Sequence, residues 1–106
     1  MPEMHFHVKW PNGKADRCYS PSYVVEEHLV VGEAYSVTEF VTRVRTALEI
    51  ASERVRAKYG FACSSALDQL RSIEETAAAL APAEREGRVH VLEFEKHAPR
   101  DARKSG

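Results

Sequence analysis

The stretch SVTEFVTRVRTALEIASERVRAKYG, residues 36–60, decides the fold. Ser36 and Glu39 form the S-x-x-E pattern of a capping box, and Gly60 lies where helices commonly end in a left-handed residue. Between these ends, apolar residues recur at every third or fourth position and form one stripe: Phe40, Val41, Val44, Leu48, Ala51, Val55 and Tyr59. The sequence therefore predicts a long central helix that buries one face.

Two further helices are expected beside the central one. After a short link, a second amphipathic stretch carries an apolar stripe and ends before Pro82. That stripe consists of Leu67, Leu70, Ile73, Ala77 and Leu80. Earlier in the chain, Ser20 followed by Pro21 fits an N-cap with proline at the first helical position, which predicts a short helix over about residues 21–28.

The N-terminal segment predicts a β-hairpin. In MHFHVKW, residues 4–10, apolar and polar residues alternate with the period of a half-buried strand. Asn12 and Gly13 follow, and both residue types tolerate the positive φ of a tight turn. Residues 14–20 should therefore return antiparallel to the first strand.

A third strand is expected over Arg88–Glu95. Val89 and Val91 differ in parity from Leu92 and Phe94, so this strand would carry apolar side chains on both faces. The predicted fold class is α+β, in the order ββαααβ, with the hairpin and the C-terminal strand in a small antiparallel sheet packed by two long amphipathic helices. A second apolar face of the sheet would have to be shielded from water by another protein surface. We therefore predict a homo-oligomer or a partner protein.

Length and composition limit the number of domains and the classes of partner that the chain can have. With 106 residues, 43% of them hydrophobic and 29% charged, the chain suits one globular core, and disorder of the whole chain is excluded. We expect one α+β domain over residues 1–95 and a basic, disordered tail over residues 96–106. The net charge of -1 disfavours nucleic acid as a partner. No apolar run suits a membrane span or a signal peptide, so we expect a cytoplasmic protein with no membrane partner.

The two cysteines are candidate reactive thiols. Cys63 lies just before the second long helix, where the helix dipole would favour a thiolate, and Cys18 lies on the second strand. The alternative is that each is a small buried hydrophobic residue. We favour this alternative because no Cys/His nucleophile signature surrounds either thiol.

The histidines are candidate metal ligands. His5 and His7 share the outward face of the first strand, and His90 would approach them if the third strand pairs with the first. A stable site needs three or four ligands, and His28 and His97 stand too far apart in the sequence to complete one. HxxxH, HExxH and CxxC motifs are absent from the sequence. We therefore expect solvated strand histidines, with no metal and no cofactor.

Arg43, Ile50 and Arg54 form a candidate partner surface on the central helix. At 100° per residue, Ile50 falls beside the two arginines and away from the apolar stripe. An exposed isoleucine between arginines could anchor a partner protein. The alternative is an ordinary solvated face with i,i+4 pairs such as Glu39 with Arg43. Phosphate-binding loops and nucleophile elbows are absent from the sequence, so no catalytic residue is predicted.

The segments MPEMHF, WPNG and CYSPS, and above all ASERVRAKYGFACS at residues 51–64, resemble a family of small bacterial proteins of a nitrogen-starvation response. The resemblance runs from Met1 to about Phe94. Members are typically encoded in gene clusters with a nitrilase, a radical-SAM protein, an acetyltransferase-like protein and a flavin-dependent oxidoreductase. The resemblance thus implies work on nitriles or other scarce nitrogen sources. It transfers no catalytic residues, although Cys18 and Cys63 fall within its characteristic segments.

Two functional hypotheses follow. The first is a non-enzymatic accessory or protein-interaction protein of a nitrogen-starvation and nitrile-utilisation gene cluster, acting as a homo-oligomer or bound to a protein from the same cluster. The second is a small-molecule or metal-binding protein, or a minor enzyme, that uses Cys18, Cys63 and the histidines. The distance between the thiols and the histidines distinguishes the two hypotheses, because the second requires the thiols and a histidine to converge in one pocket.

Overall fold

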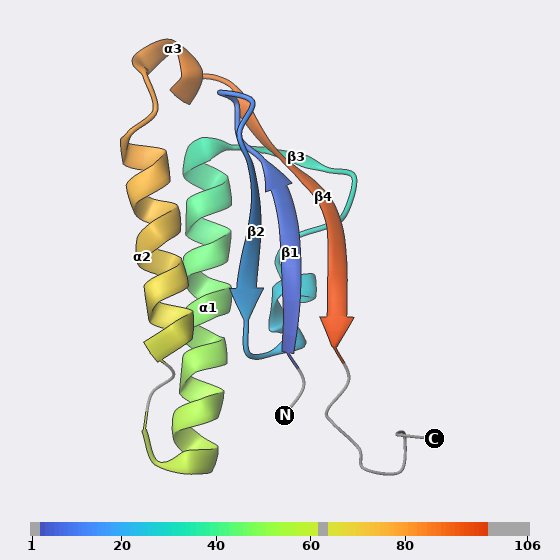
Figure 1. The fold of residues 1–106 in the computed structure, drawn as a ribbon, viewed down its shortest axis with the longest axis vertical. Coiled ribbons are helices and arrows are strands. Elements are labelled where there is room, and N and C mark those ends of the chain that lie inside the picture. The colour runs from blue at the N-terminus through green and yellow to red at the C-terminus, as the bar shows by residue number, and fades with distance from the viewer. Residues whose placement is uncertain (1–2, 62–63, 98–106) are drawn as a thin grey trace.

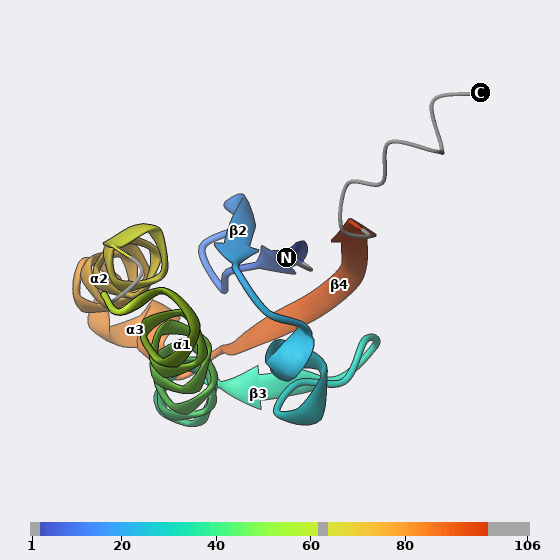
Figure 2. The ribbon, with the colours of Figure 1, turned by 90° about the horizontal axis from the view of Figure 1, so that it is seen from below.

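The structure is a computed structural model that describes residues 3–61 and 64–97. The elements are β1 (Glu3–Lys9), β2 (Ala15–Ser20), the 3-10 helix η1 (Tyr23–Glu27), β3 (Ala34–Ser36), α1 (Val37–Tyr59), α2 (Ser64–Ala78), α3 (Pro82–Arg85) and β4 (Arg88–His97). The strands form one antiparallel sheet in the order β2-β1-β4-β3 (Figure 1). Helix α1 and η1 pack on one face of the sheet, and no described element covers the other face (Figure 2). The predicted α+β fold class is confirmed.

The central helix has the ends that its sequence predicts. Ser36 is the N-cap, and its hydroxyl oxygen accepts a hydrogen bond from the backbone N–H of Glu39 at 3.1 Å. At the other end, Gly60 has a left-handed backbone with φ of 88°, and its N–H donates to the carbonyl oxygen of Arg56. Both ends are fixed by local chemistry, which is why the sequence locates them.

The predicted hairpin of β1 and β2 is confirmed. Gly13, in the turn, has a φ of 89°, and Phe6 lies opposite Cys18 across the two strands. Trp10 packs edge-on against Phe40 of α1, with ring centroids 5.4 Å apart, which joins the hairpin to the central helix. The largest fully buried side chains are Trp10, Phe6, Phe40, Met4, Leu29, Leu48, Ile73, Val8, Val24, Val25, Val44 and Val89.

The segment between the hairpin and α1 differs from the prediction. It forms a 3-10 helix over Tyr23–Glu27, capped by Ser22, whose hydroxyl accepts from the N–H of Val24. Ser20 is not the cap: it is buried, and its hydroxyl donates to the carbonyl oxygen of Ser22. A fourth strand, β3, then pairs with β4 at the sheet edge. Because β3 has three residues, it is too short to show an alternation that a sequence could reveal.

A β-bulge lies in the middle of β4. The pairing with β1 passes from His7 opposite Glu93 to Val8 opposite Val91, so Leu92 is an additional residue on β4. Such an extra residue inverts the alternation of side chains beyond it.

The bulge overturns the prediction of a second apolar face. Phe94 lies opposite Phe6 and packs against the core, on the same side of the sheet as Val89. Leu92 is the bulge residue and is 47% exposed. The change of parity in the sequence therefore reports a bulge and does not report an apolar outer face.

The C-terminal strand ends at His97, two residues beyond its predicted end. The predicted tail falls mostly on residues 98–106, which lie outside the described residues. Within the described part of the chain, none of the helices has the length and apolar character needed to cross a membrane.

Candidate functional site on the open face of the sheet

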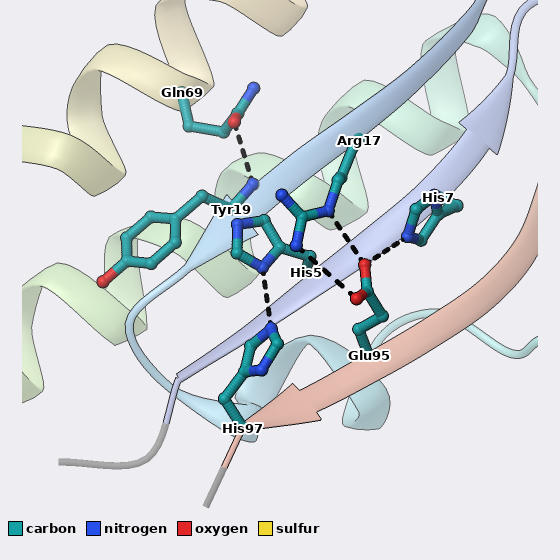
Figure 3. A network of polar contacts seen from close by, with 7 residues as sticks. All are labelled: His5, His7, Arg17, Tyr19, Gln69, Glu95 and His97. Carbon is teal, nitrogen blue, oxygen red and sulfur yellow. Dashed lines mark hydrogen bonds and ion pairs between the residues drawn. The ribbon is translucent and has the colours of Figure 1, made fainter. Parts of the chain in front are cut away.

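Three polar side chains, His7, Arg17 and Glu95, meet on the open face, one from each of β1, β2 and β4 (Figure 3). The ring N–H of His7 donates to Glu95 Oε1 at 2.6 Å, and Arg17 Nε donates to the same oxygen at 2.8 Å. Hydrogen bonds from Arg17 and His7 lower the pKa of Glu95 to about 2. The carboxylate is therefore ionised at neutral pH and fixed between two donors, which gives the face a prearranged charge pattern.

The same face brings two histidines together. His5 Nδ1 lies 3.1 Å from His97 Nε2, and the His5 ring also packs edge-on against Tyr19 at 5.6 Å between centroids (Figure 3). Burial, followed by the nearby positive charge of Arg17 and by His97, lowers the pKa of His5. The lowered pKa favours the neutral form of the His5 ring at pH 7.

Sequence reasoning missed His97 as a member of this cluster. The third strand does pair with the first, but the antiparallel register places His90 opposite Lys9, at the far end of the sheet from His5. His97 lies opposite Glu3 instead, next to His5. This contact could have been predicted from the assumed antiparallel pairing of the first and last strands. Such pairing places the last residues of β4, including His97, beside the first residues of β1.

The open face continues into a hollow beside α2. The hollow has a volume of about 490 Å³ and is lined by His5, Tyr19, Ser65, Asp68, Gln69 and Ser72. Gln69 closes the β2 edge, since its Oε1 accepts a hydrogen bond from the backbone N–H of Tyr19 at 2.8 Å. The lining offers hydroxyl, amide, imidazole and carboxylate groups, so it suits a hydrogen-bonding ligand or a polar partner side chain.

Of the two candidate thiols, Cys18 does not lie on this face. Cys18 is 1% exposed and points into the core opposite Phe6, whereas His5 and His7 lie on the other side of the sheet. Burial, with a smaller contribution from Asp16, raises the pKa of the Cys18 thiol to about 12. Cys18 is therefore a packing residue, as we favoured from the sequence. Cys63 lies outside the described residues.

No three His, Cys, Asp or Glu side chains of residues 3–61 and 64–97 are grouped so that they could hold a metal ion. The sequence-based expectation of a protein without metal or cofactor stays a prediction.

The candidate surface on α1 has intramolecular partners. Ile50 is partly buried and packs against the core, so the prediction that it is exposed is wrong. Arg43 donates to the carbonyl oxygen of His28 at 2.9 Å, and Arg54 donates to the hydroxyl of Ser22 at 3.0 Å. These contacts hold the segment around η1 against α1. Partner binding by this surface stays a prediction.

Comparison with known proteins places the chain in a family. No curated protein and no solved structure matches it. The sequence profile of one family, described as nitrogen starvation-induced protein NitG, matches residues 5–94. This range includes most of β1 and β4 and all the elements between them. The chain therefore belongs to the family of nitrogen starvation-induced protein NitG.

Proposed function

We propose that this chain is a non-enzymatic accessory protein that binds a partner protein through the open face of its sheet, within a nitrogen-starvation and nitrile-utilisation gene cluster. The observation that carries the proposal is the Glu95 carboxylate held between Arg17 and His7 on a sheet face that no described element covers. Charged groups already held in place lose little conformational entropy when a partner docks. They also select the partner by charge complementarity.

The chemistry of the described residues supports an interaction protein over a thiol enzyme. Cys18 is buried on the core side of the sheet, and a thiol with a raised pKa supplies little of the nucleophilic thiolate at neutral pH. Arg, Tyr and other aromatic side chains are common in protein interfaces, and the open face presents Arg17 and Tyr19. We place this interaction in the cytoplasm, without nucleic acid or membrane.

The partner we favour is one of the cluster-encoded proteins: the nitrilase, the radical-SAM protein, the acetyltransferase-like protein or the flavin-dependent oxidoreductase. A second copy of the chain is less favoured. Self-association drew its support from an apolar outer face, and Phe94, which was to form part of that face, packs against the core. A homo-oligomer that uses the open face of the sheet would therefore have to form largely through polar contacts.

A second candidate function is the binding of a small polar molecule in the hollow beside α2. Its support is the convergence of His5 and Tyr19 from the sheet with Asp68 and Ser72 from α2 around about 490 Å³. Cys18, which the sequence-based hypothesis of a small-molecule site included, is not part of this hollow because it faces the core.

The test is calorimetric binding of the purified chain to each of the four cluster-encoded proteins. Arg17→Ala removes the charged donor from the open face and should weaken binding by about tenfold, a loss typical of a central charged contact. Arg45→Ala is the matched control, because Arg45 makes a similar exposed ion pair at 3.0 Å with Glu74, between α1 and α2. Failure of all four proteins to bind, or equal effects of the two variants, would contradict the proposal.

A further inference from the structure

Helix α1 extends beyond the core at its C-terminal end. Val55 is the last buried residue of the helix, and residues 56–61 are all exposed. In Figure 1 this end reaches further than the neighbouring end of α2 and the ends of the strands. Its last turn is therefore not required to bury apolar surface within the domain.

This projecting end nevertheless carries large apolar side chains. Tyr59 is 49% exposed and Phe61 is 67% exposed, and Leu67, in the first turns of α2, is 40% exposed. Single exposed apolar residues are ordinary, but here three of them lie within nine positions of the sequence, where α1 ends and α2 begins. Exposed aromatic side chains of this kind are frequent anchors in protein interfaces.

The projecting end also carries positive charge. Glu53 pairs with Arg56, which neutralises one arginine. Lys58 lies over the ring of Tyr59 at 5.7 Å, and Arg54 donates to a serine hydroxyl on the η1 side. Within the described residues Lys58 pairs with no carboxylate, so one positive charge remains beside the Tyr59 ring, while Arg54 is directed to the η1 side.

We infer that the projecting end of α1 is the apolar anchor of this chain, and that its partner is a protein with an apolar pocket edged by carboxylates. The inference rests on the proposed function and extends it. Exposed ion pairs contribute little to affinity, so the open face of the sheet supplies selectivity and the aromatic side chains supply most of the binding energy. Positive charge beside the aromatic rings calls for an acidic rim on the partner.

The two surfaces lie at the same end of the molecule. The hollow beside α2 is lined by His5 and Tyr19 of the sheet and by Ser65 and Asp68 in the first turns of α2. The projecting end of α1 reaches past these first turns of α2 (Figure 1). A partner that covers this end of the molecule can therefore contact both the hollow and the apolar anchor. A lipid surface is the weaker fit, because one unpaired basic residue gives little attraction to anionic headgroups.

The experiment measures binding to the same four cluster-encoded proteins. The double variant Tyr59→Ala/Phe61→Ala should weaken binding of the partner by about tenfold or more, and Lys58→Glu should weaken it through repulsion by the acidic rim. The melting temperature of both variants should stay within about 2 °C of the wild type, because these side chains are exposed. Val30→Ala/Val31→Ala is the matched control, since these residues are 57% and 45% exposed on a different loop.

The outcomes separate this inference from the proposed function. Loss of binding in the double variant, with the control unchanged, supports the anchor. Full binding by the double variant together with weak binding by Arg17→Ala overturns the anchor alone. If none of the four proteins binds the wild-type chain, both proposals fail. Binding of the wild type to phosphatidylglycerol vesicles that the double variant loses, with protein binding intact, would overturn the anchor in favour of a lipid contact.

Discussion

Replacing Cys18 with Ser should lower the free energy of unfolding by about 1–3 kcal/mol, because it puts a hydroxyl into a site that is 1% exposed and faces Phe6. Cys18→Ala should cost less, about 1 kcal/mol, since it removes one sulfur atom and adds no polar group. For a domain of this size each kcal/mol corresponds to about 4–8 °C in melting temperature. The serine variant should therefore melt clearly below the alanine variant.

The same burial predicts slow alkylation of Cys18. With a pKa of about 12, its thiolate fraction at pH 8 is about 10⁻⁴, whereas an ordinary cysteine has a fraction of about one quarter. Ionisation alone should then slow the reaction about a thousandfold, and burial slows it further because labelling requires local opening.

The assay is iodoacetamide labelling at pH 8, followed by mass spectrometry, beside thermal melting of the two Cys18 variants. Both measurements use a Cys63→Ala background, so that only one thiol reports. The matched reference is the same protein in denaturant, where Cys18 should label at the rate of a free cysteine. Fast labelling of the native protein, with the serine variant melting like the wild type, would refute the packing role of Cys18.

Three further predictions test the rest of the fold. Because the pKa of Glu95 is lowered in the folded state, its ionisation stabilises the fold above about pH 4.5, and this stabilisation is lost as the pH falls toward about 2. Glu95→Gln should therefore flatten the curve of unfolding free energy against pH between these two values. An unchanged curve would contradict the hydrogen-bonded network around Glu95. Deletion of Leu92 should leave β4 in a regular alternation with Phe94 still facing the core, so a native-like circular dichroism spectrum is expected and an unfolded chain would disprove the bulge. Ser36→Ala should cost about 1 kcal/mol in denaturant unfolding through loss of the helix cap, and no loss would mean that the cap is dispensable.

The ends of α1 and the β1–β2 hairpin could be predicted from the sequence because their determinants are local. Ser36 with Glu39 and the left-handed Gly60 act within one helical turn, and the Asn12–Gly13 turn acts between adjacent strands. The buried state of Cys18 follows from the same alternation that places the histidines on the opposite face. Residues a few positions apart in the sequence settled these features.

Only the tertiary structure decided how β4 meets the rest of the chain. The contact of His5 with His97 joins residues 92 positions apart, and the network around Glu95 depends on a strand register that the bulge at Leu92 sets. The partial burial of Ile50 likewise depends on neighbours outside its own helix. A helical wheel or an alternation pattern describes one segment at a time. The register of paired strands and the burial of side chains depend instead on how distant segments pack against each other.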